Sequence, residues 1–263
     1  MAQVDLTKPT PTDKNEALTK AGFEEEAPPA YTAMQKAVAE FVGTFALIFI
    51  GVGSIIAAAA AHGGQGGAGL VTIAIAHGLA IAVMVSAVGH ISGGHLNPAV
   101  TVAAAAARKI HPTEAGIYIG AQLAGGIAGA AVLRGALPES LWRAAKLGTP
   151  GLGAGVNAAH GVLIEAVLTF FLVWVIFATA VDPQGSFGKI AGLAIGFVVV
   201  MDIMAGGPFT GGAMNPARFV GPALVGGYWK DLWVYIVGPI AGGLGAAAVY
   251  GLVILPRHQP VTV

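Results

Sequence analysis

Six long apolar segments constrain this chain more than any other feature of its sequence. They cover residues 37–61, 69–91, 114–136, 160–181, 188–206 and 231–255. A helix of about 20 apolar residues is long enough to cross the hydrocarbon core of a bilayer. Only 10% of the 263 residues are charged, whereas a soluble domain usually has about a quarter. The sequence therefore predicts an all-α membrane protein with six transmembrane helices.

Two shorter apolar stretches, 97–108 and 215–226, each begin with the triplet Asn-Pro-Ala. The triplets are Asn97-Pro98-Ala99 and Asn215-Pro216-Ala217. Asn is a favoured N-cap and Pro is favoured at the first helical position, so each triplet predicts the start of a helix. Because these stretches are too short to span the bilayer, we expect two re-entrant half-helices.

The two halves of the chain resemble each other. The triplets are 118 residues apart (215 − 97), and Glu40 and Glu165 lie in similar apolar segments 125 residues apart (165 − 40). Each half holds three spans, with a half-helix between the second and the third. Repeat one covers about 35–136 and repeat two about 159–256. Because three is odd, the second half enters from the opposite face, which predicts an inverted repeat with both half-helices starting at the midplane.

Residues 1–34 are polar, contain the acidic run Glu24-Glu25-Glu26 and lack the apolar stretch of a signal peptide. We interpret them as a disordered cytoplasmic tail that precedes a channel domain over 35–258. Basic residues in the predicted loops favour cytoplasmic N- and C-termini. The inner set is Lys8, Lys14, Lys20, Lys36, Arg108, Lys109, Lys189 and Arg257; the outer set is Arg134, Arg143, Lys146 and Lys230.

The predicted midplane combines polar side chains with helix ends. Asn97 and Asn215 are expected to donate amide N–H groups there, between two positive helix ends that repel cations and orient water against proton transfer. Glu40 and Glu165 need buried partners. We expect them to accept main-chain N–H groups of the re-entrant loops, with a proton relay as the alternative. His95 is expected to brace its loop, with a pH gate as the alternative.

The patterns Ser92-Gly93-Gly94-His95-Leu96-Asn97-Pro98-Ala99-Val100-Thr101 and Gly211-Gly212-Ala213-Met214-Asn215-Pro216-Ala217-Arg218 resemble the paired signatures of the aquaporin, or major intrinsic protein, family. The resemblance covers roughly residues 36–256. It implies a homotetramer embedded in membrane lipid, in which each protomer is a passive water channel that excludes protons and ions.

The same resemblance implies a selectivity constriction formed by His77, Ile203, Gly212 and Arg218. This combination is similar to the tonoplast-type branch of the family, which implies a wider throat that passes ammonia, hydrogen peroxide or urea beside water. A glycerol or urea facilitator is the alternative. Facilitators of the family carry an Asp after the constriction Arg, whereas this chain has Phe219.

Composition and motifs exclude several other classes of protein. The 13 basic and 13 acidic residues cancel, so a nucleic-acid partner is not expected. The absence of Cys excludes disulfides, thiol catalysis and thiolate metal sites. No catalytic motif is present, so we expect neither an enzyme nor a cofactor or metal. An ion-coupled secondary transporter stays as a further alternative, with Glu40 and Glu165 as its candidate coupling groups.

Overall fold

The computed structural model describes residues 30–61, 68–185 and 190–255. The chain divides into two units, Met1–Tyr31 and Thr32–Val263, and the fold below is that of the second. Nearly all of the expected tail lies outside the described residues, together with the basic residues Lys8, Lys14, Lys20, Lys189 and Arg257.

Six helices in the described part of the chain are long and apolar enough to cross a membrane. They are α2 (Ala33–Ala61), α3 (Ala68–Ser92), α5 (Pro112–Ala136), α7 (Ala158–Ile176), α8 (Ala191–Thr210) and α10 (Val234–Val249). Two π-helical turns, η2 (Phe177–Val181) and η4 (Tyr250–Ile254), extend α7 and α10. The predicted all-α membrane fold is confirmed.

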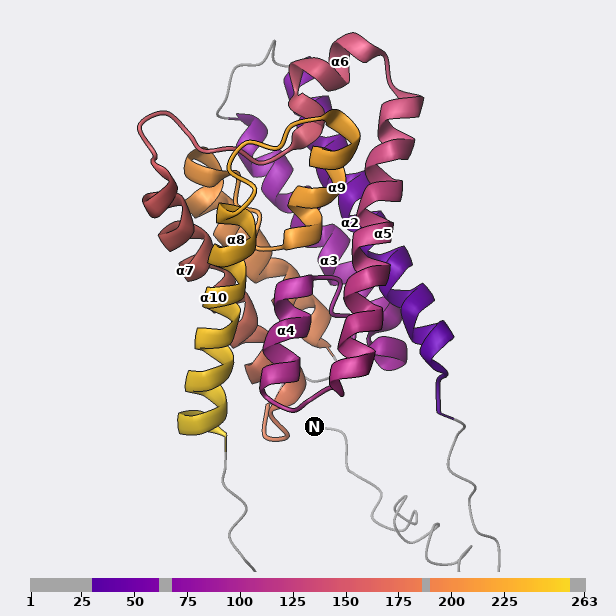
Figure 1. Ribbon diagram of the computed structural model, residues 1–263, viewed down its shortest axis with the longest axis vertical. Coiled ribbons are helices and arrows are strands. Elements are labelled where there is room, and N and C mark those ends of the chain that lie inside the picture. The colour runs from indigo at the N-terminus through magenta and orange to yellow at the C-terminus, as the bar shows by residue number, and fades with distance from the viewer. Residues whose placement is uncertain (1–29, 62–67, 186–189, 256–263) are drawn as a thin grey trace, which may run out of the picture. The chain divides into compact units, whose positions relative to one another are not determined.

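Two short helices lie between the long ones. They are α4 (Pro98–Ala106) and α9 (Pro216–Gly226), and each begins at the Pro of an Asn-Pro-Ala triplet. Figure 1 shows α4 and α9 in opposite halves of the bundle, with the starts of both helices directed toward its centre. The predicted pair of re-entrant half-helices in an inverted repeat is therefore present.

Helix packing repeats between the two halves. In the first half α2 packs against α5 and α3, and in the second half α7 packs against α10 and α8. Glycines permit the first of these contacts in both halves, because a Cβ at Gly125 would collide with the Phe41 main chain and one at Gly242 with the Ala166 main chain. Helices α3 and α8 then join the halves to each other.

The structure differs from the prediction in several places, of which three have a clear physical reason or add a new element. Helix α2 begins at Ala33, within the expected tail, because Thr32 and Gln35 form a reciprocal capping box in which each side chain accepts the other's main-chain N–H. The fifth span begins at Ala191 and continues to Thr210, past its predicted end at 206. The connection after α5 contains a short helix, α6 (Glu139–Ala144), and a 3-10 turn, η1 (Lys146–Gly148). The sequence did not predict α6 or η1, because segments this short have no apolar periodicity to detect.

Candidate functional site: a narrow channel between the half-helices

The loops that lead into α4 and α9 have the same backbone shape. Three positions in each loop have left-handed φ angles: +87°, +62° and +52° in the first (Gly93, Gly94, Leu96) and +85°, +56° and +53° in the second (Gly211, Gly212, Met214). Leu96 and Met214 carry side chains, and a left-handed residue of this kind costs of order 1–3 kcal/mol. Both loops therefore need strong contacts to keep them in this conformation.

Two buried carboxylates supply those contacts. The Glu40 carboxylate accepts the main-chain N–H of His95 at 2.9 Å and of Leu96 at 2.7 Å. It also accepts the Ser92 hydroxyl at 2.6 Å and the Gln122 amide at 2.8 Å. All of these neighbours donate, so both carboxylate oxygens act as acceptors and hold the loop in its left-handed turn.

Glu165 performs the same task in the second loop. Its carboxylate accepts the main-chain N–H of Ala213 at 2.9 Å and of Met214 at 2.7 Å, and the Thr210 hydroxyl at 2.7 Å. Both Glu40 and Glu165 are fully buried. Each carboxylate is thus surrounded by hydrogen-bond donors, most of them from the loop that it holds and, for Glu40, one from α5.

The two triplet asparagines bind each other's loops. Asn97 Nδ2 donates to the Met214 carbonyl at 2.9 Å, and Asn215 Nδ2 donates to the Leu96 carbonyl at 2.9 Å. Each Asn Oδ1 caps its own half-helix by accepting the N–H of the residue two positions later. An Asn amide has two N–H groups, and within the described residues only one on each Asn has a protein partner. Because both side chains line the channel, the second N–H of each can donate to a molecule there.

Pro98, Ala99, Pro216 and Ala217 are buried in the first turns of α4 and α9. Their side chains do not line the channel, since of the two triplets only the asparagines do. The Pro residues supply the fixed φ of a first helical turn, and the Ala residues supply the N–H groups that the asparagine side chains cap.

His95 lies on the channel wall and is fixed on several sides. Its Nδ1 lies 3.1 Å from Thr101 Oγ1, and its ring packs edge-on against Tyr118 at 5.3 Å between centroids. Thr101 donates to the Asn97 carbonyl and already accepts the Gln122 amide. His95 Nδ1 therefore donates to Thr101, and the side chain braces the first loop against α4.

Arg218, directly after the second triplet, is held by two acceptors. Its Nε donates to His77 Nε2 at 3.2 Å, and its Nη1 donates to the Gly148 carbonyl at 2.8 Å. His77 Nδ1 lies 2.8 Å from the Ile73 carbonyl, so Nδ1 carries a proton and Nε2 is the acceptor. With both ring nitrogens of His77 occupied, the guanidinium is the main hydrogen-bonding group of this part of the wall.

Ile203 and Gly212 line the same channel as His77 and Arg218. A Cβ at Gly212 would lie 3.3 Å from the Ile203 Cα, so these two residues are direct neighbours. The structure therefore brings together all four residues of the expected constriction. Two of them are polar, and the other two present only an aliphatic side chain and bare backbone.

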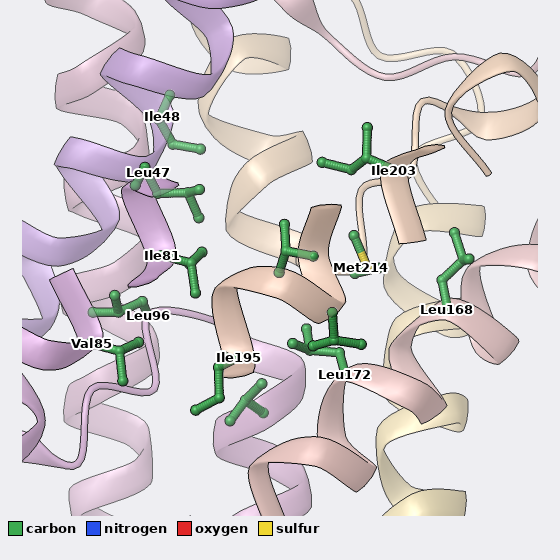
Figure 2. Close-up of a cluster of buried hydrophobic side chains, with 14 of the residues drawn as sticks. Leu47, Ile48, Ile81, Val85, Leu96, Leu168, Leu172, Ile195, Ile203 and Met214 are labelled. Atoms are coloured by element: carbon green, nitrogen blue, oxygen red, sulfur yellow. The ribbon is translucent and has the colours of Figure 1, made fainter. Parts of the chain in front are cut away.

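The channel between these groups is narrow and mostly apolar. Its volume is about 40 Å³, and a buried water needs roughly 10–15 Å³ on this measure. It therefore has room for about three water molecules by that rule. Figure 2 shows part of its wall, with Ile81 and Val85 from α3, Leu172 from α7, and Ile195 and Ile203 from α8.

Several residues of this site were not predicted from the sequence. Tyr118 and Tyr235 donate their hydroxyls to the Ser92 and Thr210 carbonyls and so support the two loops at equivalent places. Their separation of 117 residues (235 − 118), close to that of the triplets, is a signal that could have found them. Gly148 acts through its carbonyl, for which a sequence offers no signal.

The described residues contain no group of three or more His, Cys, Asp or Glu side chains that could hold a metal ion. What they do contain is a single narrow path between two half-helices whose starts meet, inside an inverted repeat of spanning helices. This arrangement defines a membrane channel with a polar centre.

Comparison with known proteins agrees with this class. The model of the major intrinsic protein family matches residues 29–250. Aquaporin TIP4-4 of Zea mays is 46% identical over 230 residues, covering 85% of this chain and 89% of the relative. Aquaporin TIP2-3 of Arabidopsis thaliana is 43% identical over 233 residues, covering 88% and 91%. The aquaglyceroporin of Plasmodium falciparum has a similar structure, with a TM-score of 0.74 and 25% identity over 85% of this chain and 97% of that one.

The chain belongs to the major intrinsic protein family. Its relatives of 43–46% identity are named as aquaporins of the TIP type, which confirms the predicted resemblance to the tonoplast-type branch. It is therefore an integral, multi-pass membrane protein and a passive channel for water and small neutral solutes, not an enzyme.

Proposed function

We propose that this channel conducts ammonia and hydrogen peroxide beside water and excludes protons and ions. We further propose that it works as a homotetramer in the lipid bilayer, with both termini in the cytoplasm. Its TIP-type relatives are named as aquaporins, which supports the conduction of water.

The observation that carries the substrate range is the chemistry of the constriction. Arg218 has five N–H donors, and two are used on His77 and Gly148. Among the described residues the other three donors have no protein partner and can donate to a solute, while Ile203 and Gly212 contribute no polar side chain. A small molecule that accepts hydrogen bonds is favoured in such a throat, and water, ammonia and hydrogen peroxide all accept them.

The proposed exclusion of cations and protons is supported by the charges and donors along the path. The positive ends of α4 and α9 meet at Asn97 and Asn215, and the Arg218 guanidinium adds a full positive charge. A cation meets repulsion at both places. A water molecule that accepts N–H groups from both asparagines points its own hydrogens outward, which interrupts proton transfer along the file.

The test is solute uptake by liposomes that contain the purified protein, with stopped-flow scattering for water and glycerol and internal dyes for ammonia and peroxide. Wild type should pass water, ammonia and peroxide readily and glycerol poorly. Ile203→His narrows the throat and adds a polar wall, so ammonia and peroxide flux should fall while water flux persists. Ile203→Leu keeps volume and apolarity and serves as the matched control.

Three outcomes would contradict the proposal. If the wild type excludes ammonia and peroxide, the proposed substrate range is wrong. Glycerol flux that rivals water flux makes the protein a glycerol facilitator. A proton or Na⁺ current comparable with water flux, or solute uptake driven by an ion gradient, contradicts a passive, ion-excluding channel.

Native mass spectrometry of the detergent-extracted protein tests the tetramer, and protease access to terminal tags in sealed vesicles tests the orientation.

A further inference from the structure

The carbonyl that holds Arg218 comes from an unusual piece of backbone. Gly148 lies in η1, where Lys146, Leu147 and Gly148 have successive φ values of +48°, +47° and +61°. Residues with side chains seldom adopt this conformation, and it persists only where the surrounding structure holds it. Something outside η1 must therefore keep the Gly148 carbonyl 2.8 Å from Arg218 Nη1.

Helix α6, directly before η1, is held by a clamp in which its Trp142 indole contacts two arginine side chains. Trp142 is only 4% exposed. The guanidinium of Arg134 lies 5.0 Å from its ring centroid, and that of Arg143 lies 4.8 Å from it. Arg143 also forms an ion pair with Glu139 one turn earlier in α6. A helix of six residues is not stable by itself, so these contacts fix α6 and the turn that follows.

The clamp is also tied to the helix that carries Arg218. Arg134, near the end of α5, donates from Nη1 to the Val225 carbonyl at 2.6 Å. Val225 lies at the end of α9, and Arg218 lies in the first turn of the same helix. Leu147 is fully buried, and its Cβ would lie 3.3 Å from a Cβ at Gly226. The connection after α5 therefore contacts α9 at both of its ends.

We infer that Trp142 and Arg134 are positioning residues for the Arg218 constriction. Stacking of Trp142 on Arg134 holds α6 against α5, whose Arg134 also binds the end of α9. This fixes η1, which packs against α9, so that the Gly148 carbonyl faces the guanidinium. Without the stack, Arg218 keeps only His77 as an acceptor and its guanidinium moves more freely across the throat. Discrimination against solutes larger than water then falls. The inference rests on the proposed role of Arg218 in selectivity.

The experiment compares the ratio of glycerol to water permeability in liposomes for Trp142→Ala, alone and combined with Arg218→Ala. Trp142→Ala should raise the ratio several-fold in the wild-type background and leave it unchanged in the Arg218→Ala background, because the clamp acts through that guanidinium. Trp142→Phe keeps an aromatic face for Arg134 and should restore most of the discrimination. Trp174→Ala removes a different indole, one that packs on Phe170 and Tyr250, and should leave the ratio at the wild-type value.

Folding of each variant is checked by gel filtration and by its melting temperature. If Trp142→Ala does not fold, Arg134→Gln removes the cation and its bond to Val225 with less loss of volume, and the same rise in ratio is expected. The inference is overturned by a folded Trp142→Ala with the wild-type ratio, or by an equal rise in both backgrounds. A different result, Arg218→Ala with the wild-type ratio, would instead overturn the proposed constriction.

Discussion

The two loop-holding carboxylates are equivalent by repeat, yet their replacement by Gln should have unequal costs. In Glu165→Gln the new NH2 group must face donors, because Ala213 N, Met214 N and the Thr210 hydroxyl all donate to the carboxylate. Whichever way the amide turns, at least one buried main-chain N–H loses its acceptor, which costs about 1–3 kcal/mol. The other bonds lose their charge assistance, so we expect a total cost of about 2–4 kcal/mol.

Glu40→Gln should be milder because a neighbour can adapt. Gln122 donates its Nε2 to the Glu40 carboxylate, and its Oε1 is buried without a partner among the described residues. If the Gln122 amide turns over, that oxygen accepts an N–H of the new side chain, and the Thr101 hydroxyl turns its proton from the Asn97 carbonyl to the same oxygen. The Gln122 NH2 then takes the partnerless position, so the net gain is one acceptor for the new amide. In the described part of the second repeat, no side-chain amide bonds to Glu165. We therefore expect Glu40→Gln to cost about 1–2 kcal/mol less than Glu165→Gln.

The assay is reversible unfolding by SDS in mixed micelles, followed through the fluorescence of the four Trp residues. Water permeability of each variant in liposomes gives a second readout, since a relaxed Met214 turn would move Asn215. In the double variant of Glu40→Gln with Gln122→Ala no amide can adapt, so its loss of unfolding free energy should approach that of Glu165→Gln. Equal destabilisation by the two single variants, or a greater cost for Glu40→Gln, would refute the reasoning.

Three further predictions concern the channel wall. A Cβ at Gly51 would overlap the His77 ring, so Gly51→Ala should displace that ring and change the glycerol-to-water flux ratio. Gly53→Ala, whose Cβ would find its nearest neighbour at 3.5 Å, should leave the ratio unchanged. Asn97→Ala or Asn215→Ala should lower stability by about 2 kcal/mol, since each loses a helix cap and a cross-loop hydrogen bond, and should raise proton leak measured with a pH dye. Because the chain has no Cys, mercurials should leave water flux unchanged, and reversible inhibition would reveal another metal-binding side chain.

Much of the fold could be predicted from the sequence because the bilayer permits few alternatives. A span of about 20 apolar residues has to be helical, since lipid offers no partner for unpaired main-chain groups. The triplets at Asn97 and Asn215 carry their own start signals, and their matched spacing implies the inverted repeat. The helix starts at Pro98 and Pro216 follow from these local preferences alone.

Other parts of the site depend on contacts between segments that are distant in the chain. The sequence places Arg218 beside a triplet, but only the folded protein brings His77 and the Gly148 carbonyl to its guanidinium, across 141 and 70 residues. The tautomer of His77 follows from its hydrogen bonds, and so does the number of donors left for a solute. The clamp at Trp142 had no signal, because cation–π stacking has no sequence period and α6 is too short to show one. Periodicity and capping are local properties that a sequence carries directly, whereas the direction of a donor is set by the tertiary packing around it.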